Sequence, residues 1–151
     1  MGIVRSIMFD WGRTLYDSEN QVPFSETEKV LQFLSKLYLL VIVSLVSDGN
    51  IEKRMQVLQA CGIERYFSAV YFAQKDKDSL YATALANLGL LAREVAIVDD
   101  RVVRGIRWGN ICGATTIWLR RGKFRDEGPN EETGEPTYVI SNLEEVCSLR
   151  L

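Results

Sequence analysis

A chain of 151 residues falls in the size range of one globular domain, and a domain of this length buries about two thirds of the surface that its unfolded chain exposes. Hydrophobic residues make up 47% and charged residues 25%, which are proportions of a folded globular protein and exclude a disordered or fibrous chain. The formal net charge of -2 argues against a general electrostatic attraction to nucleic acid or to a membrane surface.

Two further features of the composition limit the chemistry. The chain has no histidine, which excludes Ser-His and Cys-His nucleophile pairs and histidine metal ligands, and leaves carboxylate and lysine chemistry. The scattered cysteines Cys61, Cys112 and Cys147 are typical of reduced thiols. The most apolar run, 37–46, is too short to span a bilayer, and the N-terminus lacks the design of a signal peptide. We therefore expect a cytoplasmic protein.

Short apolar runs rich in Val and Ile alternate with longer stretches whose apolar residues recur at helical spacing. This alternation predicts βαβ units and a parallel sheet with helices on both faces. Strands are expected at 3–9, 40–46, 69–72, 94–98 and 114–119, and helices at 26–38, 50–61, 78–89 and 101–112. The predicted fold is a Rossmann-like three-layer α/β/α sandwich with a mainly parallel sheet of five or six strands.

The C-terminal part completes this pattern. The charged, Gly- and Pro-rich stretch 120–136 has no periodicity and is expected to be a surface loop. A last strand at 137–140 and a short helix from Asn142 follow it. Gly62 and Gly89 stand where helix C-terminal glycines are expected. We expect residues 1–151 to form a single domain.

Polar residues come directly after several of the predicted strands. They are Asp10, Ser47, Lys75, Asp99 and Asp100. In open α/β sheets, ligands bind outside the carboxyl ends of the strands. These residues are therefore the candidate site.

The segments around these residues resemble four motifs of the haloacid dehalogenase-like hydrolase superfamily, in the family's order and across nearly the whole chain. They are IMFDWGRTLYDS (7–18), VSLVSDGN (43–50), QKDKDSLYATALANLGL (74–90) and AIVDDRVVRGIRWGNICGATTIWL (96–119). The family's motifs are an aspartate nucleophile in D-x-D-x-T, a Ser or Thr ending the second strand, a lysine, and an acidic pair after the fourth strand. The resemblance continues into the closing strand, PTYVI (136–140).

The resemblance implies a role for each matching residue. Asp10 corresponds to the nucleophile. Ser47, with the adjacent backbone at Asp48, would hold phosphate oxygens at a helix N-terminus, although Ser-Asp-Gly-Asn is also simply a good helix start. Lys75 and Lys77 compete for the lysine position, and family spacing favours Lys75, six residues before Tyr81 and 25 before Asp100.

The acidic pair points to a metal. Adjacent carboxylates that face another carboxylate repel one another unless a divalent cation lies among them, and Mg²⁺ is the natural choice. In the family, the ligands would be Asp10, Asp99, Asp100 and the backbone carbonyl of Gly12. An Asp N-cap at a strand-to-helix turn would explain one of the two aspartates but not both.

Two family aspartates are absent, since Gly12 and Gly105 occupy their positions. The first is the general acid and base of the phosphatases, whose loss costs about two to four powers of ten in rate for a poor leaving group and little for an acyl phosphate. Asp17, Asp48 and Tyr16 are candidates for a substitute acid.

The spacing between the motifs leaves no room for an inserted cap domain. Residues 15–24 can form at most a small flap. In the family, an uncapped site goes with macromolecular substrates or with oligomers in which a neighbouring subunit closes the site. A phosphorylated small molecule or macromolecule is the expected partner, a homo-oligomer stays open, and neither nucleic acid nor a membrane is expected.

Three functional hypotheses follow. The first is a Mg²⁺-dependent phosphohydrolase acting through an aspartyl-phosphate on Asp10. The second is a catalytically impaired protein that binds phosphate or a phosphoprotein, which Gly12 and Gly105 motivate. The third is a 2-haloacid dehalogenase, whose halide leaving group needs no proton; the missing cap and the retained Asp pair argue against it.

Overall fold

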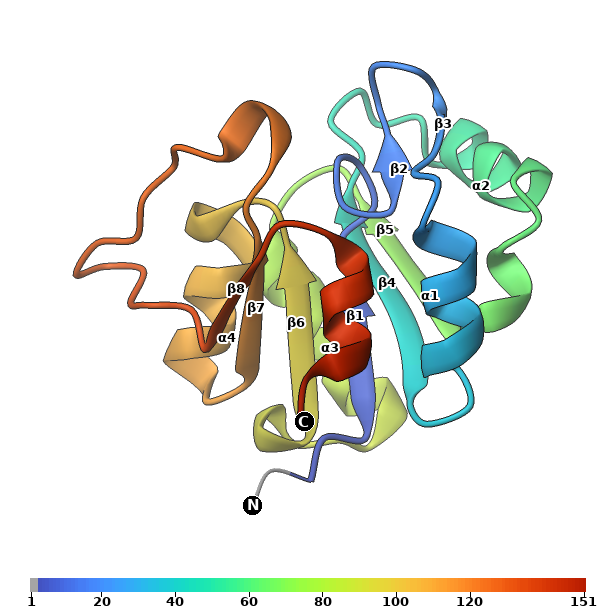
Figure 1. The fold of residues 1–151 in the computed structure, drawn as a ribbon. Coiled ribbons are helices and arrows are strands. Elements are labelled where there is room, and N and C mark those ends of the chain that lie inside the picture. The colour runs from blue at the N-terminus through green and yellow to red at the C-terminus, as the bar shows by residue number, and fades with distance from the viewer. Residues whose placement is uncertain (1–2) are drawn as a thin grey trace.

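The structure is a computed structural model that describes residues 3–151. Its centre is a six-stranded sheet in the order β5-β4-β1-β6-β7-β8, and every neighbouring pair is parallel (Figure 1). The strands are β1 (Ser6–Phe9), β4 (Leu39–Leu45), β5 (Ala69–Ala73), β6 (Val95–Asp99), β7 (Thr115–Leu119) and β8 (Tyr138–Ile140). The predicted α/β fold with a mainly parallel sheet is confirmed.

The register of the central strands positions the candidate site. Phe9 of β1 pairs with Ile42 of β4 on one side and with Val98 of β6 on the other. Because parallel strands end at the same edge of the sheet, Asp10 and Asp99 follow these positions at the same level. Both β1 and β6 are buried along their whole length, as expected for the centre of a sheet with both faces covered.

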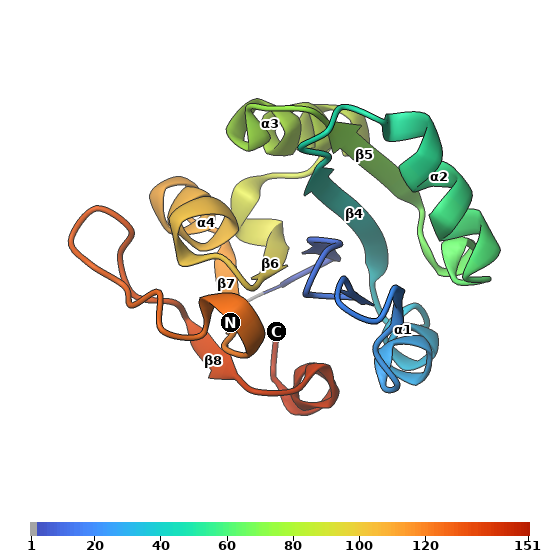
Figure 2. The same cartoon turned by 90° about the horizontal axis from the view of Figure 1, so that it is seen from above.

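Helices cover both faces of the sheet (Figure 2). One apolar cluster packs α1 (Thr27–Leu34), α2 (Ile51–Ala60) and the 3₁₀ helix Leu143–Ser148 against one face. A second cluster packs α3 (Lys77–Leu88) and α4 (Arg107–Cys112) against the other. Odd and even residues of each strand alternate between the two clusters, which is the period of two expected of a strand buried on both faces.

Element boundaries differ from the prediction in a few places. α1 ends at Leu34 rather than at residue 38, and the segment predicted as helix 101–112 starts with a π-helical turn, Val102–Ile106. Gly62 and Gly89 follow their helices with φ of 73° and 66°, a left-handed conformation that glycine adopts without strain. The predicted loop contains one 3₁₀ turn, Gly122–Phe124.

The segment between β1 and α1 forms the small flap that the sequence allows. It is a hairpin of two short antiparallel strands, β2 (Tyr16–Asp17) and β3 (Val22–Pro23). The hairpin stands above the carboxyl ends of the central strands (Figure 1). Across residues 3–151, no helix is long and apolar enough to cross a lipid bilayer.

Candidate active site

Asp10 lies at the centre of the carboxyl edge of the sheet. It directly follows β1, its backbone N–H donates to the Val98 carbonyl at 3.0 Å, and it is only 8% exposed. Burial opposes ionisation of this carboxyl, but the charge and hydrogen bond of Lys77, with a hydrogen bond from Ser44, outweigh burial and lower its pKa. Asp10 is therefore a carboxylate at neutral pH, as a nucleophile must be.

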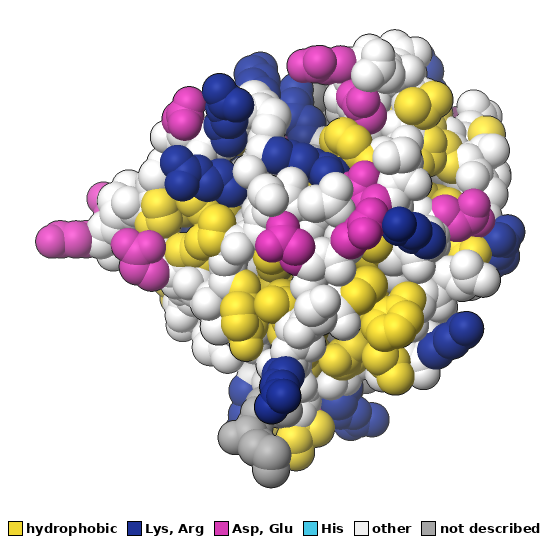
Figure 3. Space-filling view, viewed as in Figure 1, with side chains coloured by type: hydrophobic (Ala, Val, Ile, Leu, Met, Phe, Trp, Pro, Cys, Tyr) yellow, Lys and Arg dark blue, Asp and Glu magenta, His cyan; other side chains and the backbone are white. Residues whose placement is uncertain are grey.

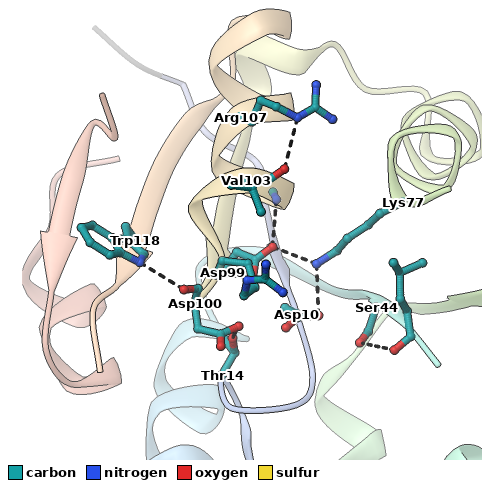
Figure 4. A network of polar contacts seen from close by, with 12 residues as sticks. Asp10, Thr14, Ser44, Lys77, Asp99, Asp100, Val103, Arg107 and Trp118 are labelled. Carbon is teal, nitrogen blue, oxygen red and sulfur yellow. Dashed lines mark hydrogen bonds and ion pairs between the residues drawn. The ribbon is translucent and has the colours of Figure 1, made fainter. Parts of the chain in front are cut away.

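Lys77 joins Asp10 to the acidic pair (Figure 4). Its Nζ donates to Asp10 Oδ1 at 3.1 Å and to Asp99 Oδ2 at 2.8 Å, and the residue is 5% exposed. Burial alone would lower the pKa of this ammonium, but the two carboxylates raise it well above the usual range. A fixed, buried positive charge therefore stands beside Asp10.

The prediction that favoured Lys75 over Lys77 is wrong as to position. Lys75 is exposed and does not line the pocket above Asp10. Between the two lysines, Asp76 caps α3, with φ of 63° and a side chain that accepts from the Ser79 N–H. α3 therefore begins at Lys77, whose side chain points toward Asp10 and Asp99 while Lys75 remains in solvent.

The two aspartates of the acidic pair have different partners. Asp99 accepts hydrogen bonds on both oxygens, from the Arg101 N–H on Oδ1 and from Lys77 and the Gly105 N–H on Oδ2. Three donors leave little of its capacity for another ligand. Asp99 is suited to holding Lys77 in place.

Asp100, in contrast, has spare oxygens. Its Oδ2 is buried without a hydrogen-bond partner, and its Oδ1 has only a long contact of 3.5 Å with Thr14 Oγ1. Trp118 fixes its backbone by donating from Nε1 to the Asp100 carbonyl at 3.1 Å. Burial, together with the charges of Asp10 and Asp99, raises the pKa of Asp100 to about 9.

These oxygens suit a divalent cation. Asp10, Asp99 and Asp100 each offer a carboxylate oxygen, and these atoms lie within 4.8 Å of one another. Mg²⁺ prefers such oxygen ligands, and a cation there would offset the repulsion that opposes ionisation of Asp100. The oxygens of Asp10 and Asp100 therefore fit a magnesium ion, whereas those of Asp99 already accept from three donors.

A pocket of about 420 Å³ opens above Asp10 and Asp100. Ser47, the expected phosphate-binding residue, lines it together with Gly12, whose carbonyl is an expected metal ligand. Asp48 does not: it turns away, accepts from the Asn50 N–H at 2.9 Å, and lines a separate hollow. Asp48 was predicted to lie beside the phosphate, but it is not among the residues that line this pocket.

Ser44 also belongs to the site, although it was not predicted from the sequence. This buried residue of β4 lines the pocket and contributes a hydrogen bond that lowers the pKa of Asp10. A polar residue inside the apolar run 37–46 was the available signal, because a serine in a buried strand needs a partner.

The candidates for a substitute acid do not reach the pocket. Asp17 accepts from the Asn20 side chain at 2.7 Å and from the Glu19 and Asn20 backbone N–H groups within its own hairpin, and these bonds lower its pKa. Tyr16 stacks on the buried Trp11 with ring centroids 5.0 Å apart. Neither residue lines the pocket that contains Asp10.

Comparisons with known proteins point to one family of hydrolases. The HAD-hydrolase-like family model matches residues 73–146. Two curated relatives, both named glyceraldehyde 3-phosphate phosphatase, are 28% identical over 109 residues in Methanopyrus kandleri and 27% identical over 132 residues in Methanocaldococcus jannaschii. These matches support the prediction of a haloacid dehalogenase-like hydrolase.

The matches to this superfamily differ in extent. The two alignments cover 69% and 84% of this chain but 47% and 56% of the relatives, so the chain spans about half the length of the curated relatives it matches. The solved structure of the putative HAD-hydrolase YfnB from Bacillus subtilis bound to magnesium shares the fold. Its TM-score is 0.76 at 15% identity, over 95% of this chain and 96% of that chain.

Gly105 occupies a position where the protein has no space for a side chain. A Cβ there would lie 2.5 Å from Asp99 Oδ2 and 2.7 Å from Tyr81 Oη. We expect Gly105→Ala to push Asp99 away from Lys77 and to lower the free energy of unfolding by about 1–3 kcal/mol, as overpacking does. Urea denaturation measures this change.

Gly128→Ala is the matched control, because a Cβ at Gly128 meets nothing within 4 Å. It should leave the urea midpoint nearly unchanged. Equal midpoints for the two alanine variants would contradict the tight contact between Gly105 and Asp99.

Proposed function

We propose that the protein is a Mg²⁺-dependent phosphohydrolase that transfers the phosphoryl group of its substrate to Asp10. The observation that carries the proposal is Lys77 bridging Asp10 and Asp99 beside the unpartnered oxygen of Asp100. The ionised carboxylate of Asp10 therefore has the buried ammonium of Lys77 on one side and the free oxygens of Asp100, which can bind a metal, on the other. Such a site can bring an anionic phosphoryl group to an anionic nucleophile.

Each residue has a defined part in the proposed reaction. A carboxylate oxygen of Asp10 attacks phosphorus, the bond from phosphorus to the leaving oxygen breaks, and an aspartyl-phosphate forms. Water then attacks this acyl phosphate and releases inorganic phosphate. Lys77 offsets the charge of the nucleophile and of the phosphoryl group, and Ser47, at the pocket wall, hydrogen-bonds phosphoryl oxygens.

Asp10, Asp100 and the backbone carbonyl of Gly12 would hold the metal. When bound, Mg²⁺ supplies charge neutralisation for the phosphoryl oxygens. Asp99 was also predicted as a ligand, but its two oxygens already accept from Lys77, Arg101 and Gly105. We assign Asp99 to positioning Lys77, which leaves Asp100 as the main ligand from the acidic pair.

The missing acid at Gly12 determines which substrates react well. An alkoxide leaving group needs a proton, whereas the carboxylate released from an acyl phosphate does not. The two relatives support a phosphorylated small-molecule substrate, since both are named glyceraldehyde 3-phosphate phosphatase. Among such compounds, we expect acyl phosphates to react much faster than sugar phosphates.

Hydrolysis of acetyl phosphate and of a sugar phosphate, each with and without Mg²⁺, tests this proposal. Phosphate release from acetyl phosphate should depend on Mg²⁺ and should disappear in Asp10→Asn, which removes the nucleophile with little change in shape. The sugar phosphate should react about 10²–10⁴ times more slowly. Turnover that survives in Asp10→Asn would contradict the assignment of the nucleophile.

The second candidate function is binding of a phosphorylated partner without turnover. Gly12 favours it, since the acidic residues that line the pocket are Asp10 and Asp100, which the first proposal already assigns to attack and to metal binding. Phosphate or beryllofluoride binding without release of phosphate from either substrate would support this alternative.

A further inference from the structure

The pocket above Asp10 is lined by more positive charge than one phosphoryl group requires. Its arginines are Arg13, Arg54, Arg101 and Arg104. Arg101 is neutralised by Glu127, at 3.0 Å. Within residues 3–151, the guanidinium groups of the other three form no ion pair and donate no hydrogen bond to another side chain.

Arg54 shows most clearly that an acceptor belongs in the pocket. The residue is half-buried on α2, its guanidinium lies 5.7 Å from the ring centre of Phe72, and its Nη1 is buried with no hydrogen-bond partner. A buried donor without a partner costs free energy, and native structures seldom leave one without a ligand, ion or water. Arg54 lines the pocket, where an anionic group would be an acceptor for its guanidinium.

The charges of Lys77 and of the aspartates around it balance one another without the arginines. Lys77 is held by Asp10 and Asp99, and the oxygens of Asp100 suit the cation. Lys77 and the cation together are sufficient for the transferring phosphoryl group. Arg13, Arg54 and Arg104 therefore remain for a different part of the ligand. Lys and Arg side chains also gather around the upper end of the molecule, at the carboxyl edge of the sheet (Figure 3).

We propose that the substrate carries a second anionic group, a carboxylate or a second phosphate, which Arg54 binds together with Arg13 and Arg104. The inference rests on the proposed function, in which the phosphoryl group itself sits at Asp10. A pocket of about 420 Å³ is of the size that holds a small molecule bearing two such groups. Arginine suits this task because its planar guanidinium donates two parallel hydrogen bonds to a carboxylate or phosphate.

Binding of phosphonates, which cannot be hydrolysed, tests whether the pocket recognises a second anionic group, and it needs no turnover. Titration calorimetry in excess Mg²⁺ would compare methylphosphonate, which has one anionic group, with phosphonoacetate and methylenediphosphonate, which have two. We expect at least one of the two doubly anionic compounds to bind about ten times more tightly or better than methylphosphonate, the gain of a hydrogen-bonded charge pair. Which of them gains more distinguishes a carboxylate from a second phosphate.

Arg54→Met should remove most of that gain and weaken the binding of methylphosphonate much less. Arg93→Met is the matched control: Arg93 is exposed, precedes β6 at the opposite edge of the sheet, and its replacement changes the net charge equally. Equal affinity for all three phosphonates, no binding of any of them, or the same loss in both variants would overturn the inference. The proposed reaction at Asp10 is judged separately, by the loss of acetyl phosphate turnover in Asp10→Asn.

Discussion

Lys77→Met is expected to lower the free energy of unfolding by about 3–5 kcal/mol, because it leaves buried carboxylates without their cation. Asp99 is fully buried, and Asp10 is nearly so, while Met has a similar length but no charge. The same change removes the positive charge that the proposed reaction needs. Urea denaturation at neutral pH measures the loss of stability, and acetyl phosphate turnover should fall to background.

Lys75→Met is the control for this expectation. Lys75 is exposed and has no ion pair within the described part of the chain, so its replacement should change stability by less than about 0.5 kcal/mol. Each variant loses one positive charge, and the two substituted lysines are only two positions apart in the sequence. A stable Lys77→Met protein beside a destabilised Lys75→Met protein would refute the placement of the lysine.

Gly12→Asp is expected to increase the hydrolysis of a sugar phosphate by about 10²–10⁴-fold, because it restores a general acid and base beside the leaving oxygen. The backbone at Gly12 is not in the positive-φ region, so an L-residue fits there. A Cβ would lie 3.3 Å from Ser18 Oγ, and Ser18 is exposed and able to shift. Phosphate release from the sugar phosphate and from acetyl phosphate measures the effect.

Gly12→Asn distinguishes the effect of proton transfer by the new side chain from the effect of its size and shape. Asn has nearly the same size as Asp but cannot transfer a proton at neutral pH. It should leave the rate for the sugar phosphate low, and acetyl phosphate should change little in either variant. An equal gain in Gly12→Asn and Gly12→Asp would show that the missing acid is not what limits the rate.

The sequence predicted the sheet well because its strands are short, apolar and separated by helices with a clear period. The carboxyl edge was predictable for the same reason: once β1 and β6 are recognised as neighbouring parallel strands, Asp10 and Asp99 must lie at one level. The small differences lie at helix ends, where capping and packing decide the boundary, as in the early end of α1 at Leu34.

The lysine was misplaced because linear spacing to Tyr81 was counted without regard to the face of the helix. Lys77, Tyr81 and Ala84 are the buried residues of α3, and their spacing places them on one side. Extending the face of Tyr81 back by one turn would have given Lys77. The signal for the helix start, Asp76 three residues before Ser79, was also in the sequence.

Other parts of the site depend on contacts that linear order does not reveal. The free oxygen of Asp100 and the saturated oxygens of Asp99 follow from the path of the π-helical turn that brings the Gly105 N–H back to Asp99. Likewise, Arg13, Arg54 and Arg104 come from three separate segments and meet only around the pocket. Such convergence is a property of the tertiary structure.

Chemical trapping of the phosphorylated residue tests the central claim most directly. The protein would be mixed with acetyl phosphate and Mg²⁺, quenched, reduced with borohydride, which converts an aspartyl-phosphate to homoserine, and digested for peptide mass spectrometry. We predict homoserine at position 10. Modification at another carboxylate, or none at position 10 while phosphate is being released, would contradict phosphoryl transfer to Asp10.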